Sequence, residues 1–303
     1  MGLRPLFLLG HYGTGWRGWA RLNDRMLSGL NGRSPSYARP LVGRVRWEGK
    51  RFDGCVFLEM EHGHGDAFVM YRWIPEVRQR VAALHVHARP DHVSLLADQW
   101  PGVTVISKKE DPGQFDQCVL SYSLPKIFGV ERPEDVARPG AYLRAVSRFR
   151  PLKGEFRVGI RWAGHVAHVF DLHRSTQLED WAPVLEVPGV SFYSLQLDTG
   201  SEQLGTLSGH IEDLAPELTD WAATAAAMME LDLIISVDTS CAHLAGALSR
   251  PVWILLSAVP EWRWMLERRD TPWYGSARLY RQERCGDWSG VFAEVARDLA
   301  ALA

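Results

Sequence analysis

Short apolar runs alternate with amphipathic and small-residue segments through most of this 303-residue chain. Short hydrophobic runs bounded by glycine, proline or charged residues are typical of buried strands. The runs predict strands at Cys55–Leu58, Leu84–His87, Val103–Ile106, Gln117–Leu120, Phe156–Ile160, Val190–Leu195, Leu233–Val237 and Val252–Leu256. The segments between and after them predict helices at Ala67–Ala83, Asp91–Gln99, Trp221–Glu230, Thr239–Leu248 and Ser289–Leu302. Strand–helix alternation at this spacing indicates an α/β protein with parallel sheets covered by helices.

The alternation occurs twice, and a proline-punctuated stretch separates the two occurrences. We therefore predict two Rossmann-like domains. The first covers residues 1–150, with residues 1–50 as an irregular lead-in, and the second covers residues 151–303. The last helix is a candidate to pack back on the first domain. Ligands of doubly wound sheets bind beyond the carboxyl ends of the strands, which for two such domains predicts a site in the cleft between them.

Composition narrows the functional classes. The formal net charge of -2 gives no support for bulk attraction to nucleic acid or to an anionic membrane. The four cysteines are far apart and form no C-x-x-C pair, and no apolar stretch approaches the 18 residues of a membrane span. We expect a cytoplasmic protein without a membrane span, a disulfide framework or a zinc knuckle. The thirteen tryptophans are interpreted mainly as core fillers, with stacking on a ligand as the alternative.

Ser236–His243 follows the apolar strand predicted at 233–237 and consists mainly of small residues. If a helix begins at Thr239, its first N–H groups have no intrahelical acceptor and, together with the helix dipole, form an anion site. Small side chains at 239–242 would allow a diphosphate to reach the backbone, and His243 lies one turn further on. The residues leave a second interpretation open, in which Asp238 or Thr239 simply caps the helix.

A second turn, Glu61–Asp66, follows the first predicted strand and carries two glycines, Gly63 and Gly65. The glycines allow close approach of a ligand, and Asp66 in a cleft could accept a proton from an acceptor hydroxyl. The alternative, which the residues alone favour, is an aspartate placed at a helix N-terminus for the dipole. Two histidine pairs, His62 with His64 and His85 with His87, have metal-like spacing but lack obvious partners, so no metal site is predicted.

A third turn, Trp162–His165, precedes Asp171 and Arg174. Arg174 could bind a phosphate through two hydrogen bonds. A surface salt bridge between Arg174 and Asp171 is the alternative, and the residues alone favour it.

Taken together, the three turns resemble glycosyltransferase family 9, the ADP-heptose–lipopolysaccharide heptosyltransferases. They resemble most closely its relatives at the C-terminal end of bacterial tetratricopeptide-repeat proteins. Further matching motifs are Tyr71-Arg72, Ser194-Leu195-Gln196, Arg250-Pro251-Val252-Trp253, Trp262-Arg263-Trp264 and Pro272-Trp273-Tyr274. The ordered set covers nearly the whole chain. It departs from the family at His165, where asparagine is usual, and after Gln196, where a lysine usually follows and this chain has Leu197 and Asp198.

The resemblance implies a GT-B fold, in which two Rossmann-like lobes face a central cleft. It implies an inverting, metal-independent transfer from a nucleotide-diphosphate sugar, with Asp66 as catalytic base and no cofactor besides the donor. The donor-side residues that it implies are Trp162, Gly164, Arg174, Gln196, Asp238, Thr239, Ser240, Cys241 and His243. The loop residues that it implies on the acceptor side are Gly63, His64, Gly65 and Arg72.

Several choices stay open at this level. The donor could be linked to ADP, GDP or UDP, and the acceptor could be a glycan, a protein or another hydroxyl compound. Two other functions are alternatives to transfer onto such an acceptor. One is a non-catalytic nucleotide-sugar-binding or scaffold protein that retains the fold. The other is a glycosyltransferase that modifies DNA, for which the net charge gives no support.

Overall fold

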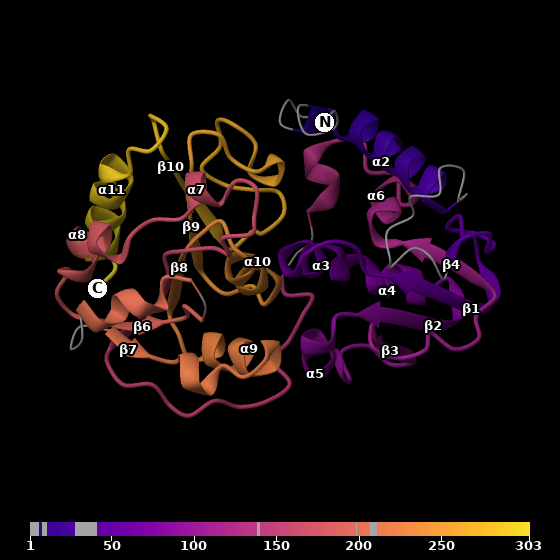
Figure 1. The fold of residues 1–303 in the computed structure, drawn as a ribbon, viewed down its shortest axis with the longest axis horizontal. Coiled ribbons are helices and arrows are strands. Elements are labelled where there is room, and N and C mark those ends of the chain that lie inside the picture. The colour runs from indigo at the N-terminus through magenta and orange to yellow at the C-terminus, as the bar shows by residue number, and fades with distance from the viewer. Residues whose placement is uncertain (1–5, 8–10, 28–40, 138–139, 198, 207–210) are drawn as a thin grey trace. The chain divides into compact units, whose positions relative to one another are not determined.

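The structure is a computed structural model that describes residues 6–7, 11–27, 41–137, 140–197, 199–206 and 211–303, so Asp198 lies outside the described residues. The chain divides into two compact units, Met1–Arg138 and Pro139–Ala303, called unit 1 and unit 2 below (Figure 1). No helix of the described part is long and apolar enough to cross a membrane.

Unit 1 contains a parallel four-stranded sheet in the order β3-β2-β1-β4. Its strands are β1 (Phe52–Glu59), β2 (Val81–Ala88), β3 (Val103–Ser107) and β4 (Gln117–Leu120). Its helices are α2 (Tyr12–Leu27), α3 (His64–Met70), η2 (Tyr71–Trp73), α4 (Ile74–Arg78), η3 (Pro90–His92), α5 (Val93–Leu96), η4 (Ser121–Ser123), α6 (Leu124–Ile127) and η5 (Pro133–Val136). The four strands predicted for this region are all present.

The predicted helices of unit 1 are shorter than expected. The helix predicted at Ala67–Ala83 is broken into α3, η2 and α4, because Pro75 lacks a backbone N–H and is accommodated in the first turn of α4. The lead-in predicted as irregular contains the helix α2. Its buried Tyr12 and Trp16 pack edge-on against each other and against Phe7, which gives this helix an aromatic core.

Unit 2 contains a parallel six-stranded sheet in the order β10-β9-β8-β5-β6-β7. Its strands are β5 (Phe156–Arg161), β6 (Val190–Ser194), β7 (Ile211–Asp213), β8 (Leu233–Val237), β9 (Val252–Leu256) and β10 (Ala277–Arg281). Its helices are α7 (Asp171–Arg174), η6 (Leu178–Trp181), α8 (Ala182–Leu185), η7 (Ser201–Thr206), η8 (Ala215–Glu217), α9 (Trp221–Met229), α10 (Ser240–Ala247), η9 (Trp262–Trp264) and α11 (Ser289–Ala300). Every residue of β8 and β9 is buried, as expected for strands covered on both faces.

Two strands of unit 2 were not predicted. β7 is only three residues long, and β10 carries arginines at two of its five positions. Both lie at the edges of the sheet, where one side of a strand meets solvent and a polar sequence is tolerated. Neither edge strand therefore shows the apolar run by which the central strands were recognised.

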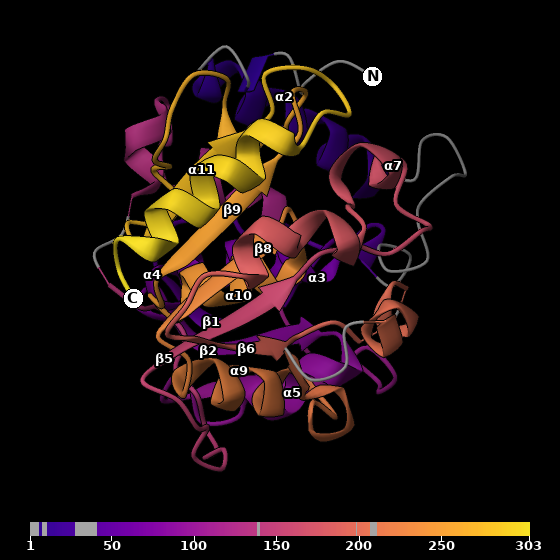
Figure 2. The same ribbon diagram turned by 90° about the vertical axis from the view of Figure 1, so that its left-hand side faces the viewer.

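The last helix, α11, belongs to the core of unit 2. It contacts α8 and β10, and it runs along one side of the sheet (Figure 2). Its buried residues Val291, Phe292, Val295 and Leu299 join a cluster with Trp181 of η6.

The division between the units falls at 138–139, whereas the sequence predicted 150–151. A local reason for the difference is that the backbone N–H groups of Tyr142 and Leu143 both donate to the carbonyl of Ala247 at 3.1 Å, which ties the segment to the end of α10.

Candidate functional site

The predicted donor-side residues of unit 2 follow three neighbouring strands. Register pairs Arg161 of β5 with Ser236 of β8, and Ile160 of β5 with Ser194 of β6. Because the three strands are parallel, their carboxyl ends meet at one edge of the sheet. The turns that follow these strands, which contain Trp162, Gly164, Gln196 and Thr239, therefore lie together at this edge.

Gln196 joins two of these turns. Its side chain is fully buried. Its Oε1 accepts from the N–H of Ala163 at 3.1 Å, and its Nε2 donates to the carbonyls of Ala163 at 3.1 Å and Thr199 at 2.6 Å. The turn after β5 is held further by Trp162, whose Nε1 donates to the carbonyl of Gly200 at 3.2 Å. Gln196 and Trp162 thus hold the backbone of these turns in place.

The start of α10 bears on the capping interpretation of Ser236–His243. Thr239 is the N-cap residue, but its side chain makes no capping hydrogen bond. Its Oγ1 lies instead 2.9 Å from Oγ of Ser236. The side-chain capping offered as the alternative is therefore wrong for Thr239. The first N–H groups of this helix, at Ser240, Cys241 and Ala242, are left without a side-chain cap and with small side chains around them.

Arg174 is attached to this helix start. Its Nη1 donates to the backbone carbonyl of Asp238 at 2.8 Å, and its Nε donates to Oδ1 of Asp171 at 3.1 Å. The predicted ion pair with Asp171 is thus present, but it is not a surface pair, because the side chains of Arg174 and Asp171 are only 16% and 10% exposed. Gly164 packs against it, and a Cβ on that glycine would lie 2.5 Å from Nη2 of Arg174. The backbone of Gly164 and the guanidinium therefore approach each other as only glycine allows.

His243 lies on the inner side of α10 and is held on three sides. Its Nδ1 is 2.9 Å from the hydroxyl of Tyr274, and its ring stacks on Trp264 with a centroid distance of 5.1 Å. Its Nε2 is 3.9 Å from Oδ1 of Asp238. Burial raises the pKa of Asp238, and the nearby Arg174 opposes this effect. The two tryptophan-rich motifs near the C-terminus thus build the wall behind the predicted phosphate site.

Arg161 is a residue of this region that was not predicted as part of the site. It is buried, and its Nη1 donates to the carbonyl of Leu195 at 2.8 Å and to Sγ of Cys241 at 3.6 Å. Burial raises the pKa of Cys241, and Arg161 opposes the shift, so the Cys241 side chain remains a thiol. The signal in the sequence was an arginine directly after the buried run Val158–Ile160.

In unit 1, Asp66 lies in the first turn of α3 and is half-buried. Its Oδ2 accepts from the N–H of Gly63 at 3.1 Å, so the aspartate does serve the helix terminus, as the alternative interpretation expected. Its Oδ1 accepts a short hydrogen bond from the hydroxyl of Tyr122. A carboxylate has about four acceptor positions and can accept several hydrogen bonds at once.

Glu61 and Tyr122 are further residues of unit 1 that were not predicted as site residues. Glu61 is buried, and its Oε2 accepts from the N–H of Tyr122 at 2.8 Å, while its Oε1 has no hydrogen-bond partner among the described residues. Burial raises the pKa of Glu61 to about 8. The backbone of Tyr122 is thus held by one carboxyl group while its hydroxyl binds another, that of Asp66.

Two other residues predicted on the acceptor side, Arg72 and His64, have different surroundings. Arg72 is buried and donates to the carbonyls of Val69 at 2.9 Å and Val136 at 2.8 Å, which is the geometry of a structural cation. His64 is half-buried, and its Nδ1 lies 2.8 Å from Nε2 of His92. Burial, reinforced by nearby positive charge, lowers the pKa of His92 well below its ordinary value, so this imidazole is neutral.

The second histidine pair of the sequence does not act as a pair. Nδ1 of His87 lies 2.5 Å from Oε2 of the buried Glu59, and Nζ of Lys108 lies 2.6 Å from its other oxygen. This three-residue cluster spans β1, β2 and the residue after β3. The ion pair with Lys108 balances the charge of Glu59, which explains how this carboxylate is tolerated in a buried strand.

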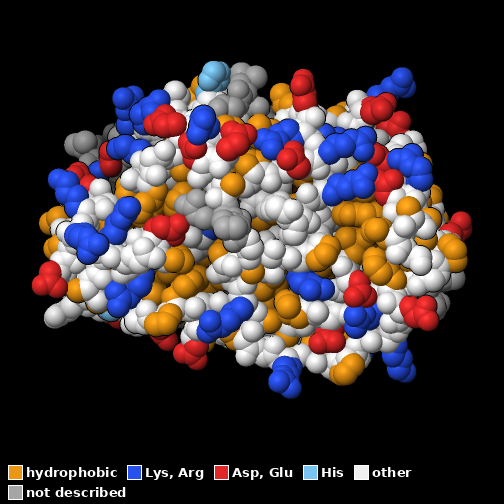
Figure 3. All heavy atoms as spheres, turned by 180° about the vertical axis from the view of Figure 1, so that it is seen from behind, with side chains coloured by type: hydrophobic (Ala, Val, Ile, Leu, Met, Phe, Trp, Pro, Cys, Tyr) orange, Lys and Arg blue, Asp and Glu red, His pale blue; other side chains and the backbone are white. Residues whose placement is uncertain are grey.

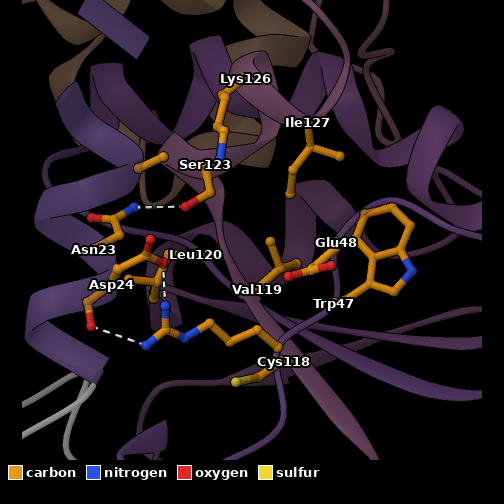
Figure 4. Close-up of a pocket in the computed structure, with 12 residues that line it drawn as sticks. Asn23, Asp24, Trp47, Glu48, Cys118, Val119, Leu120, Ser123, Lys126 and Ile127 are labelled. Atoms are coloured by element: carbon orange, nitrogen blue, oxygen red, sulfur yellow. Dashed lines mark hydrogen bonds and ion pairs between the residues drawn. The ribbon is translucent and has the colours of Figure 1, made fainter. Parts of the chain in front are cut away.

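A cavity of about 440 Å³ opens elsewhere in unit 1, between α2, β4 and α6 (Figure 4). Asn23 and Ser123 are hydrogen-bonded across it at 2.9 Å, and Arg46 pairs with Asp24 at its side. None of the predicted site residues lines this cavity. On the face shown in Figure 3, basic and acidic side chains intermingle and no broad basic area is visible.

Comparisons with known proteins agree with this architecture. No protein-family model matches the chain. Protein FlbA of Caulobacter vibrioides is 26% identical over an alignment of length 338, which covers 98% of this chain and 54% of FlbA, so the chain spans about half the length of that relative. Among solved structures, the chain is similar to a family 9 glycosyltransferase from Veillonella parvula, with a TM-score of 0.60 and 10% identity over 85% of this chain and 100% of that one. It is also similar to the E. coli heptosyltransferase WaaC with ADP-2-deoxy-2-fluoro heptose, with a TM-score of 0.57 and 12% identity over 82% and 99%.

At these identities the likeness establishes the fold. The structural neighbours are family 9 heptosyltransferases, as the resemblance in the sequence predicted, and the prediction of two Rossmann-like units of the GT-B class is confirmed.

Proposed function

We propose that this chain is a glycosyltransferase that moves a sugar from a nucleotide-diphosphate sugar to an acceptor hydroxyl. The observation that carries the proposal is the start of α10. There the hydroxyl of Thr239 is turned to Ser236 and leaves the first N–H groups of the helix without a side-chain cap. A helix start of this kind, at the carboxyl end of a central parallel strand, is suited to bind a diphosphate. The shared fold with nucleotide-sugar enzymes supports the same reading.

On the donor side, the N–H groups of Ser240, Cys241 and Ala242 are proposed to hold the diphosphate oxygens. Arg174, attached to the carbonyl of Asp238, adds a fixed positive charge beside them. Negative charge grows on the diphosphate as its bond to the sugar breaks, and preorganised donors stabilise that charge. Because amides and a guanidinium supply this stabilisation, we propose that the transfer needs no metal ion at the diphosphate. The base could be adenine, guanine or uracil.

On the acceptor side, Asp66 is proposed as the general base. The acceptor oxygen attacks the anomeric carbon from the side opposite the diphosphate. A new carbon–oxygen bond forms as the old one breaks, so the configuration at that carbon inverts, and the hydroxyl proton passes to Asp66. Tyr122 holds Oδ1 of Asp66, and Gly63 holds Oδ2, so the carboxylate is oriented before the acceptor arrives.

A thermal-shift screen with ADP-, GDP- and UDP-linked sugars tests the proposal. A donor present at about 100 times its dissociation constant stabilises the chain by about 2.7 kcal/mol. The sugar that gives this shift is then incubated with a panel of acceptor hydroxyl compounds, and release of the nucleotide diphosphate is measured. Acceptor-dependent release supports a transferase. Binding without transfer across the panel would instead favour the non-catalytic nucleotide-sugar-binding protein.

A further inference from the structure

Three potential metal ligands converge in unit 1 outside the proposed donor site. Nδ1 of His64 lies 2.8 Å from Nε2 of His92 and 3.5 Å from Oδ2 of Asp91. The three ligand atoms all lie within 4.8 Å of one another. His64 comes from the start of α3, whereas Asp91 and His92 come from η3. Histidine spacing in the sequence does not reveal this cluster, because its members come from two separate elements.

His92 is held in one orientation by its surroundings. Its side chain is fully buried, and its ring stacks on Phe68 with a centroid distance of 4.6 Å and an interplanar angle of 10°. Its Nδ1 lies 2.8 Å from the hydroxyl of the buried Tyr71. An imidazole whose second nitrogen bonds a fixed oxygen partner keeps one ring orientation, which is the usual support of a metal-bound histidine. The Tyr71 hydroxyl can accept from Nδ1–H of His92, and Nε2 is then the nitrogen that can bind an ion.

The two carboxylate oxygens of Asp91 face different side chains. Its Oδ1 faces Nε of Arg89 at 3.8 Å, whereas its Oδ2 faces His64. The side chains of Asp91 and His64 are 45% and 31% exposed. Two of the three ligands can therefore adjust their positions, while the third, His92, is fixed by packing.

We propose that His64, Asp91 and His92 form a site for a divalent transition metal, with Zn²⁺ as the expected ion. Two histidine nitrogens and one carboxylate oxygen are a ligand set that zinc and its neighbours accept, with water in the fourth position. Zinc–nitrogen bonds of about 2.0–2.1 Å in a tetrahedral site place two nitrogens roughly 3.4 Å apart. The two nitrogens, now 2.8 Å apart, need to separate by about 0.6 Å, and the ion replaces the proton between them.

The bound ion would fasten α3 to η3. Asp66 lies in the same helical turn as His64, so the ion would also stiffen the turn that carries the proposed base. This role differs from neutralising the diphosphate, and the site goes beyond the proposed transferase function. Metal binding can therefore succeed or fail independently of sugar transfer.

The test uses the full chain, stripped of metal with a chelator and titrated with Co²⁺ as a spectroscopic probe and with Zn²⁺ by calorimetry. One ion per chain should bind and raise Tm, and Co²⁺ should develop the visible absorption of a low-coordinate site. His64→Ala and Asp91→Asn, both at partly exposed positions, should weaken Zn²⁺ binding at least about ten-fold and remove the gain in Tm. Tyr71→Phe should weaken it about ten-fold by removing the partner of His92.

His62→Ala is the matched control, since this histidine lies in the same turn but outside the cluster. It should bind Zn²⁺ as the unmodified chain does. Binding that is equal in His64→Ala and in the unmodified chain would overturn the proposal, as would the absence of any binding to the unmodified chain. Either result would leave His64 and His92 as a hydrogen-bonded pair only.

Discussion

The two units carry their predicted site residues in different ways. In unit 2 the residues around α10 are fixed by hydrogen bonds to the backbone, as Gln196 is to Ala163 and Arg174 is to Asp238. In unit 1 the residues around α3 are titratable groups that contact one another, as Tyr122 contacts Asp66 and His64 contacts His92. The first arrangement holds backbone donors in place, which suits the binding of an anion. The second can exchange protons, which suits general-base chemistry.

This difference predicts that mutations in unit 1 change the rate of transfer and leave the affinity for the donor nearly unchanged, whereas mutations in unit 2 lower the affinity for the donor. A variant that breaks this division would show that one of the two regions has been assigned the wrong role.

The largest effect is expected for Asp66→Ala, which removes the proposed base. Transfer should fall about 10²–10⁴-fold, while the dissociation constant of the nucleotide diphosphate stays nearly unchanged. Asp66→Asn is the matched control for structure, because an amide oxygen still accepts from Gly63 or Tyr122. It should keep the Tm of the unmodified chain and lose transfer equally. Retained transfer in either variant would remove Asp66 from the mechanism.

Arg174→Ala should produce the next largest effect, this time on binding. Loss of a hydrogen bond to a charged group costs about 2 kcal/mol, or roughly thirty-fold in the dissociation constant of the nucleotide diphosphate. Arg150→Ala is the control, because that arginine is half-exposed and pairs with Glu212 and Glu217 on the surface of the same unit. Equal affinities of the two variants in calorimetry would contradict the assignment of Arg174.

Gly164→Ala tests the same contact more gently. The added Cβ would lie 2.5 Å from both Nη2 of Arg174 and Oδ1 of Asp171, so the guanidinium must shift. Donor affinity should fall by less than in Arg174→Ala, by roughly 1 kcal/mol. Gly275→Ala, in the same unit, meets nothing within 4 Å and should bind the donor unchanged. A Gly164→Ala variant that is indistinguishable from this control would show that the position of Arg174 does not matter.

The last prediction concerns stability and its dependence on pH, and no effect on transfer is expected from it. The pKa of Glu61 is about 8 in the folded chain against an ordinary value of 4.5. Between these values the folded state keeps a proton that the unfolded state releases, so stability falls as pH rises through this window. Glu61→Gln should lose this dependence, so its free energy of unfolding should gain about 2 kcal/mol relative to that of the unmodified chain between about pH 6 and about pH 8. Denaturant unfolding at both values measures it, and parallel pH profiles would argue against a protonated Glu61.

Much of the fold could be predicted because the central strands are buried on both faces and read as apolar runs. β8 and β9 begin and end at the predicted residues. The edge strand β10 could not be found in the same way, because its arginines belong to a strand with one solvated side. The lead-in was predicted as irregular, and the packing of α2 could not be predicted because its aromatic partners, such as Tyr122, lie more than a hundred residues away.

The same contrast between local features and long-range contacts applies to the candidate site. Local features, such as the small residues after β8, indicated a phosphate site from the sequence. The contacts that decide its chemistry are not local. The turn of Thr239 toward Ser236, the attachment of Arg174 to Asp238 and the contact between Tyr122 and Asp66 each depend on side-chain orientation or on elements distant in sequence. Spacing within a single motif carries no information on them.

The central claim is that the first turn of α10 holds the diphosphate of the donor. Hydrogen–deuterium exchange tests it directly, because amides without an intrahelical partner exchange readily until a ligand accepts from them. The unmodified chain should be measured alone and with ADP, GDP and UDP, with the matching nucleosides as controls. The account predicts that at least one of these diphosphates slows exchange in a peptide covering residues 239–243, and that its nucleoside does not. Unchanged exchange in that peptide, with a diphosphate bound and protection found elsewhere, would contradict it.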